Sequence, residues 1–79
     1  MKRKPPRSPT PVDRGIAKRI REFRQAKGLG QVALGEAIGV TFQQVQKYEA
    51  GTNRISASRL FDVAKALETP VSKFFEGAQ

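Results

Sequence analysis

The chain has 79 residues, contains no cysteine or histidine, and carries 15 Lys and Arg against 7 Asp and Glu, for a net charge of +8. This length suits one small domain. The missing residue types exclude disulfides, thiolate chemistry and the usual zinc sites, so we expect no metal, no cofactor and no enzyme activity. The positive charge favours a polyanionic partner, nucleic acid before a membrane surface. No apolar run is long enough to span a membrane, and no secretory signal opens the chain, so we expect a cytoplasmic, nucleoid-associated protein.

Residues 1–11 hold four basic residues and four prolines, and they carry half of the net charge. Proline fixes its φ angle and has no N–H to donate, so both helix and sheet are disfavoured there. We predict a flexible basic arm over residues 1–11 and one domain over residues 12–77. Two interpretations of the arm stay open. It follows DNA phosphates or enters the minor groove, or it is a solubilising tail or a cloning remnant.

The first helix is predicted from a cap at Asp13 to about Lys27, with Gly28 ending it. Ile16, Ile20 and Phe23 follow helical spacing and form its buried stripe. Its basic residues lie mostly outside that stripe and are expected to be solvated; they are Arg14, Lys18, Arg19 and Arg21.

Two short helices joined by a tight turn are predicted over residues 31–50. The first has apolar residues at Val32, Leu34 and Ile38, close to one buried stripe. Gly39 is expected to end it with a left-handed backbone angle. Thr41 can cap the second helix, and Gly51 stops it.

The second of these helices has two unlike sides. Val45 and Tyr48 share one of them and are predicted to face the core. The other carries amides and a cation: Gln43, Gln46, Lys47 and Ala50 lie there. Gln pairs with the edge of adenine and Lys with that of guanine, so this helix suits a major groove. The alternative is an ordinary solvated face of a helical bundle.

The segments that flank this pair of helices carry further candidate contacts. The open helix start at Gln31 favours an anion, and Asn53 and Arg54 in the following loop can reach a phosphate. Ser56 is predicted to cap a helix that ends at Leu67, and Thr69–Pro70 opens a final short helix. Its adjacent Phe74 and Phe75 cannot point the same way, so one closes the core and the other is exposed or covered by a second copy.

The stretch from about Ile16 to Phe75 resembles the helix-turn-helix domain of the Cro/C1 repressor (XRE-like) family of bacterial and phage regulators. The stretches that carry the resemblance are RIREFR, GLGQ, LGEAIGV, VQKYEAG, LFDVAKAL and VSKFF. The resemblance implies an all-α, five-helix, lambda-repressor-like domain that binds a duplex operator, usually as a two-fold dimer. Its recognition helix would span residues 42–50.

The resemblance also implies roles for single residues. Groove-facing positions match Thr41, Phe42, Gln43, Gln44 and Lys47. Phosphate contacts match Gln31 and Arg54, and Asn53 completes the expected DNA-binding set. Arg24 and Glu49 match a structural pair between the first and third helices.

Three positions depart from the family pattern. Gly30 replaces a Ser or Thr cap, and Gly35 replaces an alanine, which costs about 1 kcal/mol or less in helix propensity. Phe42 replaces a polar contact residue. Either it packs on a thymine methyl group, or it packs on Gln31 and contacts no base.

The main hypothesis is therefore a sequence-specific regulator of transcription that binds double-stranded DNA, with a repressor as the expected form. We expect a homodimer on DNA and a monomer or weak dimer in solution. The alternative is an antitoxin or adaptor module that binds a protein partner through the same fold, because fold alone does not decide function. Non-specific architectural DNA binding also stays open.

Overall fold

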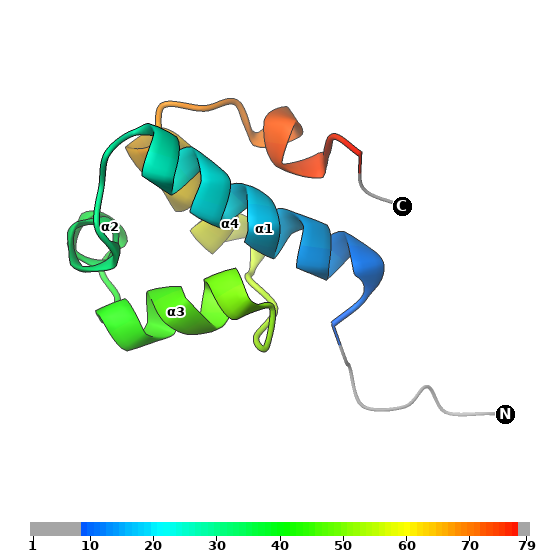
Figure 1. Ribbon diagram of the computed structural model, residues 1–79, viewed down its shortest axis with the longest axis horizontal. Helices are drawn as coiled ribbons and strands as arrows, with labels where there is room; N and C mark the ends of the chain where they lie inside the picture. Colours follow the sequence, from blue (N-terminus) through cyan, green and yellow to red (C-terminus); the bar gives the residue numbers. More distant parts are fainter. Residues whose placement is uncertain (1–8, 78–79) are drawn as a thin grey trace, which may run out of the picture.

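The computed structural model describes residues 9–77, and within that range every regular element is helical. The α-helices are α1 (Pro11–Ala26), α2 (Gln31–Ile38), α3 (Phe42–Ala50) and α4 (Ala57–Ala66), and a 3₁₀ helix, η1, covers Val71–Phe75. The all-α prediction is confirmed. The fifth element is a 3₁₀ turn rather than an α-helix. Figure 1 shows α1 crossing the molecule with α3 on one side of it and η1 on the other.

The start of α1 differs from the prediction. Thr10, not Asp13, is the N-cap, and Asp13 is the third residue of the helix. The Thr10 hydroxyl accepts the Asp13 N–H at 3.2 Å, and the Asp13 carboxylate accepts the Thr10 N–H at 2.8 Å. This reciprocal capping box satisfies two helix donors, and Pro11 suits the first helical position because no N–H is needed there. Residues 1–8 of the expected arm lie outside the described residues.

The helix ends around the central turn follow the prediction. Gly39 has a φ of 80° and ends α2, while the Thr41 hydroxyl accepts the Gln44 N–H and caps α3. Ser56 caps α4 in the same way, and Gly30 offers α2 no side-chain cap. Each of these features depends on residues within four positions of the helix end, which is why the sequence shows them.

Gly35 has a packing role beyond its helix propensity. A Cβ atom at this position would lie 2.6 Å from the Val40 carbonyl oxygen. The Val40 N–H also donates to the Gly35 carbonyl at 2.9 Å. Glycine therefore lets the turn between α2 and α3 approach the body of α2 closely.

The core is built from the inner faces of all five elements. Its buried apolar residues are Ile16, Ala17, Ile20, Leu34, Ile38, Val45, Leu60, Val63, Ala64, Leu67 and Phe74. Phe74 is fully buried and meets Phe23 edge to face, with ring centroids 5.0 Å apart. Phe75 is 44% exposed, so one of the adjacent phenylalanines closes the core, as expected.

The predicted burial of Val32 is wrong, since its side chain is 56% exposed. Two residues along a helix turn the side chain by about 200°, so Val32 lies opposite the buried Leu34. The described helices include none that is long and apolar enough to cross a membrane.

Candidate nucleic-acid interface

The outer face of α3 is open to solvent, as the sequence predicted. Its exposed residues are Phe42, Gln43, Gln46, Lys47 and Ala50, while Val45 on the inner face is completely buried. The helix packs against α1 and α2. Its only carboxylate, Glu49, points inward, and 5% of that side chain is exposed. The outer face therefore presents amide groups, one ammonium and one aromatic ring, without an acidic group to repel a polyanion.

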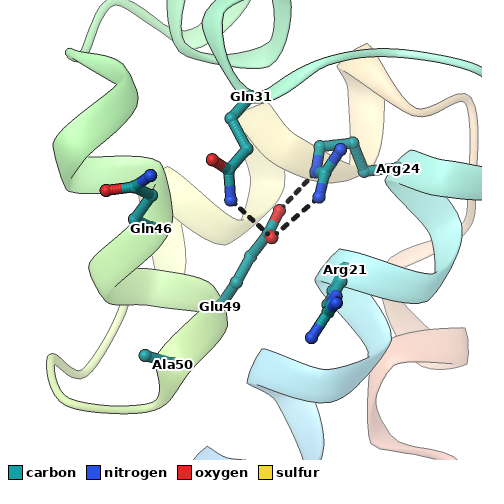
Figure 2. Close-up of a pocket in the computed structure, with 6 residues that line it drawn as sticks. All are labelled: Arg21, Arg24, Gln31, Gln46, Glu49 and Ala50. Carbon is teal, nitrogen blue, oxygen red and sulfur yellow. Dashed lines mark hydrogen bonds and ion pairs between the residues drawn. The ribbon is translucent and has the colours of Figure 1, made fainter.

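A polar network behind this face joins three helices (Figure 2). Arg24 of α1 donates to both Glu49 oxygens, at 2.5 Å and 3.0 Å, and also to the Leu29 carbonyl at 2.9 Å. Gln31 of α2 donates its amide N–H to Glu49 at 3.1 Å. The hydrogen bond to Glu49 raises the pKa of Arg24, although partial burial opposes this rise. The network holds α3 in place, and its opposite charges cancel.

Gln31, which is expected to contact a phosphate, also uses its side-chain amide in this network. One of the two amide donors is used by Glu49, and an amide group offers two. Because this bond comes from the inner side of α3, it fixes the orientation of the Gln31 side chain at the start of α2. No pattern in the sequence predicts this bond between residues 18 positions apart.

The loop after α3 is tied to the start of α1. Arg54 donates from Nε to the Asp13 carboxylate at 2.9 Å, and 44% of the Arg54 side chain is exposed. Hydrogen bonding from the Thr10 backbone, helped by the Thr10 hydroxyl and Arg54, lowers the pKa of Asp13. Asn53 is exposed beside Arg54. The two loop residues predicted to contact phosphates thus follow the C-terminal end of α3, and Arg54 is joined to the α1 capping box through Asp13.

The remaining expected contacts differ in exposure. Thr41 is exposed, although its hydroxyl oxygen already accepts the Gln44 N–H. Gln44 is half-buried at the edge of the face. Phe42 is 40% exposed, so a large part of its ring is available to a ligand.

Two residues outside the expected set border the same region. Arg21 of α1 and Gln46 of α3 line a hollow of about 550 Å³, together with Arg24, Gln31, Glu49 and Ala50. Figure 2 shows Arg21 on the opposite side of Glu49 from Gln46 and Ala50. We call this space the α1–α3 hollow. The sequence placed Gln46 on the outer side of its helix but outside the set of expected DNA contacts. For Arg21 the available signal was its position three residues before Arg24, on the same side of α1.

A family model described as helix-turn-helix matches residues 20–74, which is more than half of the chain. The chain belongs to the helix-turn-helix family. This agrees with the Cro/C1-type resemblance, and α2, the Gly39 turn and α3 form the helix-turn-helix motif.

Relatives with curated names are regulators. An HTH-type transcriptional regulator of Sinorhizobium medicae is 51% identical over 72 residues, which cover 91% of this chain and 52% of the relative. The chain thus spans about half of the length of that helix-turn-helix protein.

Solved structures share the fold. The restriction-modification controller protein C.AhdI of Aeromonas hydrophila has a TM-score of 0.75 and 31% identity, with 78% of this chain and 94% of that one covered. The P22 c2 repressor, solved in complex with a synthetic operator, has a TM-score of 0.72 and 26% identity over the same shares of the two chains. The lambda-repressor-like helix-turn-helix class expected from the sequence is therefore confirmed.

Proposed function

We propose that this helix-turn-helix chain binds a specific site in double-stranded DNA and regulates transcription, as a repressor. The observation that carries the proposal is the outer face of α3, where Gln43, Gln46 and Lys47 are all exposed and no carboxylate is present. An α-helix fits the major groove of B-form DNA, where amide and ammonium groups distinguish base pairs by their donors and acceptors. The names of the relatives support the regulatory role.

In this proposal base contacts and phosphate contacts come from different parts of the motif. Gln43, Gln44 and Lys47 contact base edges, and the exposed ring of Phe42 packs on a thymine methyl group. Gln31, Thr41, Asn53 and Arg54 contact phosphates or sugars and set the position of α3 in the groove. The neutral network of Arg24, Glu49 and Gln31 supports this arrangement because it connects α3 to both neighbouring helices.

We further propose that two copies bind DNA together. Half-sites one helical turn apart need two recognition helices, and Phe75 offers an exposed aromatic ring at η1 for contact between the copies. In solution the protein would be a monomer or a weak dimer. Sedimentation with and without the bound duplex measures this difference, and a Phe75→Ser substitution should shift the DNA-bound species toward one copy.

The direct test of the proposed function is selection of bound duplexes from a random pool, followed by binding measurements with the recovered site and a scrambled control. We expect one recovered sequence, palindromic, with half-sites about one helical turn apart. Equal affinity for the recovered and scrambled duplexes would contradict sequence-specific binding.

A protein that binds DNA would act in the cytoplasm, where bacterial DNA lies.

A further inference from the structure

We propose that Arg21 binds a backbone phosphate of the DNA duplex at the α1–α3 hollow. This inference rests on the proposed function, which places α3 in the major groove. The sequence predicts a solvated position for Arg21 on the first helix, and its side chain is exposed. The structure also places this side chain beside the recognition helix, where it lines the hollow together with Gln46 and Ala50 of α3 (Figure 2).

The charge of the hollow comes from Arg21. Of the six lining residues, three are charged, and two of these, Arg24 and Glu49, form an ion pair with each other. The other lining residues are uncharged. The net charge of this concave surface is therefore positive, which favours an anionic group such as a phosphate.

The neighbours of Arg21 leave its guanidinium without a carboxylate partner in the described part of the chain. Glu22 is next to it in sequence but forms an ion pair with Arg19 at 3.4 Å. Glu49 faces the same hollow, yet both of its oxygens accept hydrogen bonds from Arg24. Within residues 9–77 no carboxylate lies within ion-pair distance of Arg21.

The docking geometry brings a DNA strand to this position. The major groove is about 12 Å wide and a helix with its side chains is about 10–12 Å across, so the sugar–phosphate strands run directly beside an inserted helix. Because α1 packs against α3, the hollow between them opens beside one of these strands. A guanidinium group can donate two parallel hydrogen bonds to a phosphate, so Arg21 would add affinity without selecting a base.

The test compares Arg21→Gln with Lys18→Gln, which removes the same charge from the same helix. Lys18 is exposed and lines a different groove, with Arg19 and Gly77. Binding to a labelled random-sequence duplex is measured by fluorescence anisotropy over a range of salt concentrations. For Arg21→Gln we expect affinity to fall by about fivefold to tenfold at 0.1 M salt. The slope of log affinity against log salt should fall by about 0.9 in magnitude. Lys18→Gln should change the slope by much less, and Arg21→Lys should retain it.

The same titrations with the recovered site separate this inference from the proposed function. Arg21→Gln should lower the affinity for the recovered duplex and for the random duplex by the same factor, which is the mark of a phosphate contact. A slope equal to that of Lys18→Gln would overturn the Arg21 proposal and leave the proposed function intact. If the unmodified protein binds all duplexes equally, specific regulation fails, whereas the slope change still supports Arg21. Failure to bind any duplex at low salt would overturn both.

Discussion

Lys47 is the only cation on α3, and it lies on the outer face of that helix with Gln43. An ammonium group that donates to guanine adds affinity for one base pair. We expect Lys47→Ala to weaken binding to the preferred site by about 1–3 kcal/mol and to relax the preference for that base pair. Binding isotherms with the preferred and random duplexes measure both effects. Lys65→Ala on α4 is the control, and an equal loss on both duplexes for Lys47→Ala would contradict a base contact.

Glu49 stabilises the fold from the same helix. Removing one partner of a buried ion pair leaves the other charge without compensation, so we expect Glu49→Ala to lower the free energy of unfolding by about 3–5 kcal/mol. Urea unfolding measures this change. The exposed pair of Arg19 and Glu22 is the comparison, and Glu22→Ala should cost less than about 1 kcal/mol. An Arg24→Met, Glu49→Leu double variant should recover most of the loss. Equal losses for Glu49→Ala and Glu22→Ala would contradict the structural role of Glu49.

Single residues show how far sequence patterns extend. The exposure of Gln43 and Lys47 followed from helical periodicity, and the pairing of Arg24 with Glu49 followed from the family resemblance. Val32 departs from its predicted burial because it lies about 200° around the helix from Leu34, so its apolar character alone does not place it in the core. The bond from Gln31 to Glu49 depends on how α2 meets α3, a relation that neither helix sequence encodes by itself.

The first turn of α1 links helix stability to pH. The pKa of Asp13 is lowered from its ordinary value of 3.8, first by the Thr10 backbone hydrogen bond. Its carboxylate therefore stabilises the fold fully above pH 3.8, and this contribution disappears as the pH falls through the lowered value. We expect Asp13→Ala to cost about 1 kcal/mol at neutral pH, and much less well below pH 3.8.

Urea unfolding of Asp13→Ala and of the unmodified protein, at neutral pH and well below pH 3.8, measures this cost. The pKa of Glu68 is also lowered, by Lys27, so the unmodified protein loses stability in acid for more than one reason. The informative quantity is therefore the gap in the free energy of unfolding between Asp13→Ala and the unmodified protein. A gap that stays constant as the pH falls would contradict the capping role of the carboxylate.

The turn between α2 and α3 depends on Gly35. A methyl group there would meet the Val40 carbonyl, and relief of such crowding moves backbone atoms. We expect Gly35→Ala to lower the free energy of unfolding by about 1–3 kcal/mol, although alanine is the better helix former. Thermal unfolding measures the loss. The control is Gly30→Ala, because a Cβ atom at Gly30 meets no atom within 4 Å. A stabilised Gly35→Ala protein would show that the close approach is unimportant.

Helix ends were predictable where their signals are local. Thr41 and Ser56 cap the helices that follow them, as their sequence positions indicate. The start of α1 was missed because Thr10 and Asp13 both suit a cap, and their reciprocal bonding makes Thr10 the N-cap. The final element follows Pro70 as predicted, but its five residues form a 3₁₀ helix, a common form for such short helices.

The contribution of the basic N-terminal residues can be measured with two deletions. Residues 1–8 contain four of the 15 cations, whereas Thr10 and Pro11 belong to the start of α1. If these cations follow the DNA, deletion of residues 1–8 should preserve thermal stability. It should also reduce the salt slope by about 0.9 for each lost phosphate contact. Deletion of residues 1–11 should lower stability too, because the cap is removed. An unchanged salt slope would identify a solubilising tail.

The ion pair between Asp13 and Arg54 joins residues 41 positions apart, and no pattern in the sequence predicts it. Such contacts follow from the way the helices close around the core, so they become visible only in the folded chain. By contrast, the all-α class and the order of the helices followed from periodicity and capping residues, which are properties of short segments.

Because Glu49 accepts hydrogen bonds from both α1 and α2, the two sides of α3 have different roles. The inner side belongs to the framework and tolerates little change, whereas the outer side carries exposed side chains, among them Gln43, Gln46 and Lys47. Substitutions on the outward side can therefore accumulate during evolution at small energetic cost. A lineage could acquire a new target sequence by drift at a few outward positions while the scaffold beneath them is inherited intact.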